Sequence, residues 1–403
     1  MKKQTKEKGL SPTQDIEVNA DNCVVSDVGT VPSEQVIASS KTNVAEDKPQ
    51  KKHYINHLRI LAAIFVVAIH ISSPFLKTAP AWSITWIFLS IFETVIRVAV
   101  PIFVMISGAL FLDETKKLPL KKLLLHNVLR LVVIFFAWAY VYGVADIFSN
   151  DGFYWGAFID VFKNITSADG LKYHLWFLPM LIGLYLLIPL LRCMCKKENK
   201  KVVEYFLVVF FIAVAGVNYF SSLNLGIVVN TALDVVKLLD PSIFVNYIGY
   251  FVFGWYLATF DFSKKVKKLI YIIGYSVWVG GIGVNFLYSW LTNTGSLINL
   301  NAFSLFCMTA SATLFFTFKN SKFCNKPCKI IDFISNTTFG IYLTHPFIRN
   351  IVFSLFGWGY RMTCYSGWGI VLIPVYVIVV SIFSCAVTLI FNLIPKKVRR
   401  WMI

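Results

Sequence analysis

Long apolar stretches separated by short polar breaks run along most of the chain. From residue 54 onward we count about ten stretches long enough to cross a bilayer, which needs about 17–25 residues. They lie near residues 56–75, 82–112, 124–146, 174–192, 203–222, 243–260, 268–291, 299–318, 332–356 and 368–394. The pattern predicts an all-α, polytopic membrane protein with about ten transmembrane helices.

The first 52 residues have a different composition. They contain no Phe, Tyr or Trp, and eight lysines balance eight acidic residues. Such a segment cannot bury enough apolar surface to offset the entropy lost on ordering. We therefore predict a disordered N-terminal tail at 1–52 and a membrane domain at 53–403.

Composition and charge narrow the class further. Hydrophobic residues make up 57% of the chain and charged residues 15%, which excludes an ordinary soluble enzyme. The net charge of +17 is concentrated in alternate polar breaks, which hold 21 Lys and Arg against 6 in the opposite set. Because basic loops stay on the cytoplasmic side, both termini are predicted to be cytoplasmic in a multi-pass plasma-membrane protein. The charge is therefore a topology signal, and no nucleic-acid partner is expected.

Several ionisable side chains fall inside the apolar stretches, where such groups are costly and usually functional. They are Arg59 and His70 in 56–75, Glu93 and Arg97 in 82–112, Arg130 in 124–146 and His345 in 332–356. Arg59 and His70 are eleven residues apart, so on a helix they face the same way, about 16 Å apart along its axis.

Counting the helical rise from each end of a span predicts two layers. The three arginines fall within about 5–9 Å of the cytoplasmic edge, and the two histidines about 20 Å from it. Glu93 falls between the layers, where an i,i+4 ion pair with Arg97 can form. Simpler explanations stay open, since arginines snorkel to headgroups, buried ion pairs can be structural, and a membrane histidine is often an interhelical hydrogen-bond donor.

The two layers suit a particular chemistry. Arginines bind multiply charged anions such as phosphates, and a neutral imidazole is a general base or nucleophile near neutral pH. A coenzyme A thioester carries both a polyanionic head and an activated acyl group on a long arm. The competing hypothesis is a transporter or flippase with a buried polar pathway, although the chain shows no internal repeat. No metal site and no bound cofactor are predicted.

The motifs resemble those of the acyltransferase-3 family of membrane acyltransferases. The resemblance rests on Arg59-x10-His70, on RVAVPIFVMISGALFL with Arg97, Ser107 and Gly108, on Arg130, on HLWFLPMLIGLYLLIPLL with His174, Trp176, Tyr185 and Pro189, and on FGIYLTHPFI with Tyr342 and His345. It extends from about Tyr54 to Arg400.

The resemblance implies transfer of an acyl group, most often acetyl, from cytosolic acyl-CoA to a hydroxyl of a cell-surface polysaccharide or lipid-linked sugar. It implies His70 as the catalytic residue and Arg59 and Arg97 as donor-binding residues, to which the layer arithmetic adds Arg130. Supporting roles are expected for Glu93, His174, Trp176, Tyr342 and His345. Two mechanisms stay open: His70 removes the acceptor proton, or it first takes the acyl group as an acyl-imidazole. A third hypothesis is a sensor that has lost activity.

Overall fold

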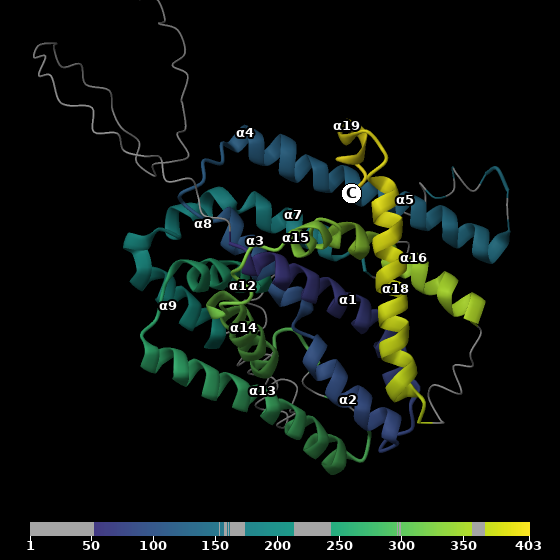
Figure 1. The fold of residues 1–403 in the computed structure, drawn as a ribbon, viewed down its shortest axis with the longest axis horizontal. Coiled ribbons are helices and arrows are strands. Elements are labelled where there is room, and N and C mark those ends of the chain that lie inside the picture. Colours follow the sequence, from purple (N-terminus) through teal and green to yellow (C-terminus); the bar gives the residue numbers. More distant parts are fainter. Residues whose placement is uncertain are drawn as a thin grey trace, which may run out of the picture. The chain divides into compact units, whose positions relative to one another are not determined.

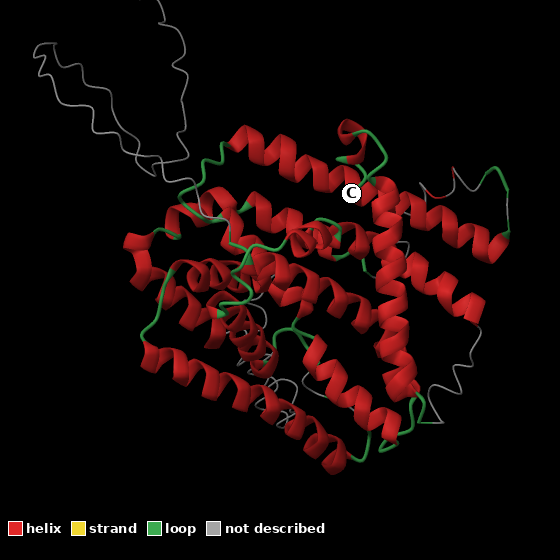
Figure 2. Cartoon of the chain, in the orientation of Figure 1, coloured by secondary structure: helices red, strands yellow, loops and turns green. Residues whose placement is uncertain are grey.

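A computed structural model describes residues 52–152, 174–212, 243–295, 300–356 and 367–403, together with 154–156, 159, 161 and 297. Within these ranges every regular element is a helix and no strand occurs (Figure 2). The predicted all-α fold is therefore confirmed. Except for its last residue, the predicted tail at 1–52 lies outside the described residues, as do most of residues 153–173 and the end of the stretch at 203–222.

The described helices are α1 Tyr54–Thr78, α2 Ile84–Ile96, α3 Ala99–Phe111, α4 Leu120–Lys122, the π-helix η1 Leu123–Val128, α5 Leu129–Asp151, α7 Phe177–Leu186, α8 Ile188–Met194, the short 3-10 helix η3 Lys197–Asn199, α9 Lys200–Phe210, α12 Ile243–Thr259, α13 Lys264–Thr292, α14 Leu305–Asn320, α15 Lys329–Ser335, α16 Thr338–Phe356, α18 Gly369–Phe391 and α19 Lys396–Arg399. Each of the predicted apolar stretches overlaps at least one of them.

Not all of these helices qualify alone as membrane spans. By length and composition, five described segments do: Tyr54–Thr78, Ile84–Phe111, Leu120–Ser149, Lys264–Thr292 and Gly369–Phe391. The pair α7 and α8, bent by 54°, makes a sixth. These spans are compatible with a total of about ten, which stays a prediction.

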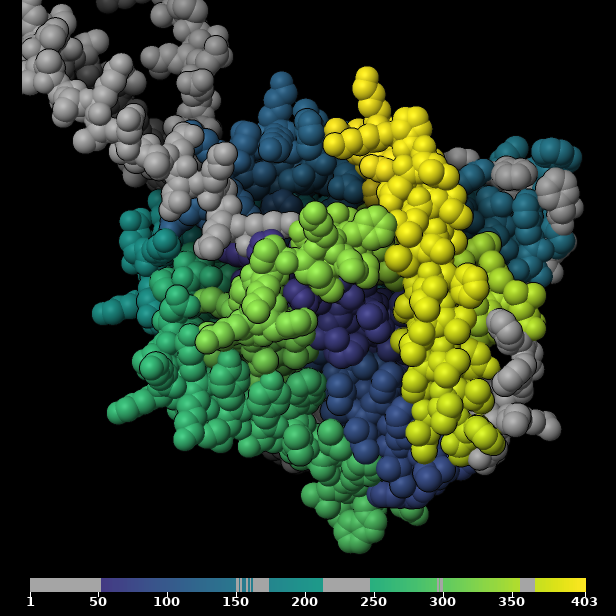
Figure 3. Space-filling model, in the orientation of Figure 1, coloured from purple at the N-terminus to yellow at the C-terminus, as the bar shows by residue number. Residues whose placement is uncertain are grey.

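Helix α1 is the central element of residues 45–403. It packs against α2, α3, α14, α15, α16 and α18, and Figure 1 shows it in dark purple among the other helices. Its core face follows helical spacing, with Leu58, Ala62 and Val66 all buried. In Figure 3 the atoms of α1 and α2 are visible between the light-green segment around α15 and yellow α18. A side chain on α1 can therefore meet groups from several helices.

Serine residues begin three of the helices. The side-chain oxygen of Ser83 accepts a hydrogen bond from the backbone N–H of Trp86 at the start of α2. Ser263 and Ser304 do the same for α13 and α14. Each cap satisfies one of the N–H groups that a helix start leaves without an intrahelical partner.

Prolines inside the apolar stretches interrupt the backbone hydrogen bonds. Proline has no N–H, so the carbonyl four residues earlier loses its helical partner. Pro101 removes the partner of the Arg97 carbonyl, and the helix breaks there into α2 and α3. Pro189 follows the bend between α7 and α8. Pro74 and Pro346 lie within the continuous helices α1 and α16.

Helices α3 and α12 touch backbone to backbone through two glycines. A Cβ on Gly108 of α3 would overlap the carbonyl oxygen of Phe251, and a Cβ on Gly254 of α12 would overlap that of Met105. Small residues allow such close approach between membrane helices. The contact fixes α3, which carries several residues of the cavity described below.

The Lys- and Arg-rich polar breaks, which we call the basic end, are residues 113–122, 192–201, 261–268, 319–329 and 395–400. Polar contacts join the first two of them. Arg192 donates to the carbonyls of Phe111, Asp113 and Lys116 at 2.6–2.9 Å. Lys52 forms an ion pair with Asp113 at 3.0 Å. Burial by itself raises the pKa of the Asp113 carboxyl, but hydrogen bonds from Thr115 and Lys52 outweigh burial and hold it below its ordinary value.

We expect Gly108→Ala and Gly254→Ala each to lower the thermal midpoint of the purified protein, because the added methyl forces α3 and α12 apart. Overpacking of this kind costs about 1–3 kcal/mol. Gly280→Ala in α13 is the matched control, since nothing lies within 4 Å of its Cβ position. Thermal unfolding in detergent, followed by tryptophan fluorescence, measures the difference. Equal midpoints for all three variants would contradict the close approach.

Candidate active site

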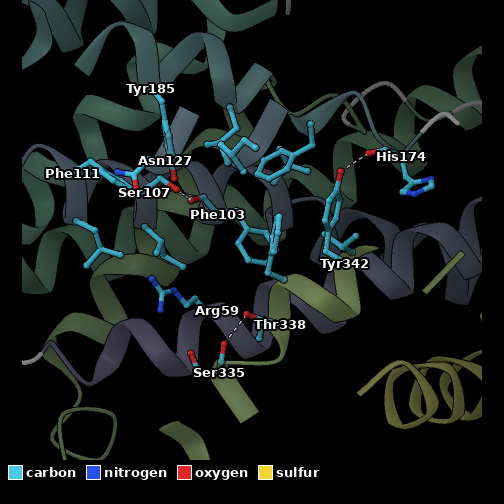
Figure 4. A pocket seen from close by; sticks show the side chains of 18 of the residues that line it. Arg59, Phe103, Ser107, Phe111, Asn127, His174, Tyr185, Ser335, Thr338 and Tyr342 are labelled. Atoms are coloured by element: carbon cyan, nitrogen blue, oxygen red, sulfur yellow. Dashed lines mark hydrogen bonds between the residues drawn. The ribbon is translucent and has the colours of Figure 1, made fainter. Parts of the chain in front are cut away.

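A cavity of about 370 Å³ lies among α1, α3, η1, α5, α7, α15 and α16 (Figure 4). Its polar lining residues are Arg59, His70, Ser107, Asn127, Arg130, His174, Tyr185, Ser335, Asn336, Thr338 and Tyr342. Helix α1 supplies both Arg59 and His70, in agreement with the prediction that these two side chains share a face.

The cavity has walls of different character. In Figure 4, Arg59 lies on the same side as Ser335 and Thr338, and Ser107, Asn127 and Tyr185 lie across from them. The half-buried Arg59 guanidinium has no ion pair with any carboxylate in the described part of the chain. The cavity therefore has a cationic wall at Arg59 with which no acidic side chain of the described ranges is paired.

His70 is held from the side of α16. Its ring stacks on His345, with ring centroids 5.1 Å apart and an interplanar angle of 23°. The depth arithmetic placed the two histidines at one level, and in the structure their rings are in contact. The His70 carbonyl, freed by Pro74, accepts a hydrogen bond from Arg349 at 3.1 Å. Both contacts fix the His70 segment of α1 relative to α16.

A third histidine completes the cluster. The ring of His174 lies edge to face against His345, with centroids 5.8 Å apart. The Tyr342 hydroxyl donates to the His174 carbonyl at 2.8 Å, which holds the segment before α7 against α16. Within the described ranges, no group of three His, Cys, Asp or Glu side chains is arranged to hold a metal ion.

Arg130 lines the cavity but already has backbone partners. It donates through Nε to the Arg400 carbonyl and through Nη2 to the Ile403 backbone oxygen, both at 2.8 Å. Trp138 donates to the Met402 carbonyl at 2.8 Å. Residues 400–403 therefore lie against α5 beside the cavity, an arrangement that no sequence pattern predicted.

Trp176 supplies a wide apolar surface to the cavity. It is 40% exposed, lines the cavity next to His174, and its ring lies 5.9 Å from that of Tyr247. His174, Trp176 and Tyr342, all predicted as supporting residues, thus border the same cavity as His70.

The predicted layer of three arginines is wrong for Arg97. Arg97 is not among the residues that line the cavity. It forms an ion pair with fully buried Glu93 at 2.6 Å and donates to Ser73 at 3.1 Å. Ser72 and Ser73 also donate to Glu93, at 2.5 and 2.8 Å. These serines follow His70 on α1, so the Arg97 side chain ends on the far side of His70 from Arg59.

The direction of helical side chains explains this error. Side chains lean toward the N-terminus of their own helix, and α2 runs toward the basic end. The Arg97 side chain therefore extends away from that end, whereas the depth arithmetic placed it by its backbone position alone. The predicted i,i+4 ion pair with Glu93 is confirmed.

Sequence reasoning also missed Arg349, which binds the His70 carbonyl. A usable signal was present, because Pro74 follows His70 by four residues and so leaves that carbonyl without a helical partner. Arg349 also follows His345 by four residues, which places both on one face of α16. Asn127, Ser335 and Thr338 carried no comparable signal.

The comparison with known families agrees with these motifs. The sequence profile of the acyltransferase domain family, acyltransferase-3, matches residues 52–393. The chain belongs to this family. This acyltransferase-3 protein is thus a membrane acyltransferase, and its resemblance to the family is confirmed over most of its length. Neither a curated protein nor a solved structure matches the chain significantly.

We expect Glu93→Gln and Arg97→Met each to reduce the yield of folded acyltransferase, because each leaves one buried charge without its partner. Breaking a buried pair from one side costs about 3–5 kcal/mol. The double variant Glu93→Gln/Arg97→Met removes both charges and should recover much of the folded yield, measured by size-exclusion chromatography in detergent.

The same double variant tests whether Arg97 binds the donor. Because Arg97 lies off the cavity, we expect the recovered protein to keep the wild-type KM for acetyl-CoA. A KM raised ten-fold or more in a well-folded double variant would show that Arg97 contributes to donor binding.

Proposed function

We propose that this acyltransferase moves an acyl group, most often acetyl, from cytosolic acyl-CoA to a hydroxyl of an extracytoplasmic or lipid-linked cell-surface glycan. In this proposal it is a plasma-membrane protein with both termini in the cytoplasm. The single observation that carries the proposal is that Arg59, Arg130 and His70 line one cavity. One ligand in this cavity can then contact both the arginines, which suit its polyanionic head, and the imidazole that carries out acyl transfer.

The donor head group is assigned to the arginines. Arg59 has no carboxylate partner in the described residues, and a guanidinium forms strong paired hydrogen bonds with phosphate. Arg59 and His70 lie about 16 Å apart along α1. This spacing suits coenzyme A, in which a pantetheine arm separates the phosphates from the thioester.

His70 is assigned to the chemical step. In the base route it takes the proton of the acceptor hydroxyl while the oxygen attacks the thioester carbon. The carbon–sulfur bond then breaks, and His70 returns the proton to the leaving thiolate, which gives an ester and free coenzyme A. In the acyl-imidazole route the ring nitrogen attacks the thioester carbon first and the coenzyme A thiolate leaves. The acceptor hydroxyl then attacks the acyl-imidazole, its proton passes to the thiolate, and the ester forms as the bond to the His70 nitrogen breaks. In both routes the His70 ring becomes positively charged during the reaction.

The acceptor is assigned to the part of the cavity near Trp176. Its exposed ring offers a flat apolar surface beside His174, and aromatic residues often provide such surfaces for partly apolar ligands. Acyl-CoA would approach from the basic end and the glycan from the other, so that the two substrates meet at His70.

We expect His70→Ala to abolish transfer, since loss of the base or nucleophile usually costs about 10²–10⁴-fold in rate. The assay follows radiolabelled acetyl transfer from acetyl-CoA into surface glycan by membranes that contain the acyltransferase. His126→Ala, which removes an exposed histidine of η1, is the matched control. Full glycan acetylation by a His70→Ala protein present at normal levels would refute the assignment.

We also expect Trp138→Phe to lower the KM for acetyl-CoA several-fold at unchanged kcat. The substitution removes the hydrogen bond that holds Met402, so donor phosphate would compete more easily with the Arg400 and Ile403 oxygens for Arg130. Phe391→Leu, which changes another ring beside Trp138, controls for altered packing. A KM that rises or stays constant in Trp138→Phe would show that donor binding leaves residues 400–403 in place.

A further inference from the structure

The sequence pair His345–Pro346 fixes one imidazole in one protonation pattern. Because Pro346 has no N–H, the Tyr342 carbonyl four residues earlier loses its helical donor. Nδ1 of His345 lies 2.8 Å from that oxygen and 3.2 Å from the Ile341 oxygen. Carbonyl oxygens only accept hydrogen bonds, so Nδ1 must carry the hydrogen. In the neutral ring, Nε2 is then left with its lone pair.

That lone pair is buried among the histidines. The His345 side chain is 1% exposed, and Nε2 has no hydrogen-bond partner in the described part of the chain. A buried acceptor without a partner costs about 1–3 kcal/mol, so natural proteins seldom keep one unless it is used. Nδ1 is turned back to its own helix, and Nε2 keeps its lone pair in the plane of the ring.

We propose that His345 is a positioning residue whose fixed ring stabilises the positive charge that forms on His70 during acyl transfer. This inference rests on the proposed function, in which His70 carries out the chemical step. The stacked ring presents a π face to a cation at 5.1 Å, within the distance at which such attraction operates. The carbonyl of Tyr342 accepts the Nδ1 hydrogen bond of His345, which adds electron density to the ring and holds its face against His70 before the reaction.

The other charged or titratable groups around His70 do not supply this stabilisation. Arg349, which donates to the His70 carbonyl, is itself a cation. Arg97 is a cation neutralised by Glu93. His174 meets His345 edge to face. His345 is therefore the neutral ring, held by its own hydrogen bond, that faces a cation at His70.

Two substitutions at position 345 separate the ring's charge role from its packing role. His345→Phe keeps a flat ring against His70 but loses the Nδ1 hydrogen bond to the Tyr342 carbonyl, which fixes and polarises the native ring. His345→Asn keeps a donor for the Tyr342 carbonyl but removes the ring and the Nε2 lone pair. We expect both variants to keep the wild-type KM for acetyl-CoA while kcat falls about 10–100-fold, which is less than the roughly 100–1,000-fold lost with a donor that touches the reacting oxygen. Thermal midpoints close to wild type in His345→Phe show that packing is preserved.

The tautomer itself is measured by nitrogen NMR. The chain has six histidines, so ¹⁵N-histidine labelling gives a small set of signals, and the His345 signals are identified by their loss in His345→Phe. The proposal requires a hydrogen on Nδ1 and none on Nε2 at neutral pH. A hydrogen on Nε2 of His345 overturns it.

Pro346→Ala provides an independent test of the cause. It restores a backbone N–H that competes for the Tyr342 carbonyl, so we expect a mixture of His345 tautomers and a kcat lowered several-fold, with KM unchanged. A single Nδ1–H tautomer in this variant would show that Pro346 is not what fixes the ring.

The outcomes keep this proposal distinct from the proposed function. If His70→Ala abolishes transfer and His345→Phe retains wild-type kcat, the role of His345 fails and the catalytic role of His70 stands. If His70→Ala retains transfer, the proposed chemistry fails whatever the state of His345.

Discussion

The site depends on one constraint: a backbone carbonyl inside an apolar helix bundle needs a hydrogen-bond donor. Helices meet this need internally, and proline is the residue that withdraws the donor. Pro74 frees the carbonyl of His70, which Arg349 of α16 binds. Pro346 frees the carbonyl of Tyr342, which His345 binds. Two prolines on neighbouring helices thus create the contacts that hold the two stacked imidazoles.

The packing around α1 makes those contacts possible. Because α1 lies between α2, α3, α16 and α18, side chains from its different faces enter separate environments. Arg59 and His70 face the cavity with α3 and α7, whereas Ser72 and Ser73 face the buried Glu93. The glycine contact between α3 and α12 fixes the opposite cavity wall.

Sequence patterns predicted the parts of this arrangement that depend on a single helix. Apolar runs gave the helices, and the eleven-residue spacing placed Arg59 and His70 on one face. Contacts between helices were harder, because depth along a span does not give the direction of a long side chain. Arg97 was misplaced for this reason, and the partners of Arg130 lie some 270 residues later in the chain, at Arg400 and Ile403. The equal depth of His70 and His345 was predicted, but the stacking of their rings was not, because depth along a span does not give the direction of a side chain.

The distribution of charge makes the two sides of His70 different. Near Ser73 the Arg97 cation is already neutralised by Glu93, so that side of His70 gains little from binding an anion. Arg59 has no carboxylate partner among the described residues, and Arg130 donates to the backbone oxygens of Arg400 and Ile403. A phosphate forms strong, charge-assisted hydrogen bonds with a guanidinium. An anionic ligand is therefore favoured on the Arg59 side of His70, and the neutral aromatic surface of Trp176 is left for a partner without charge.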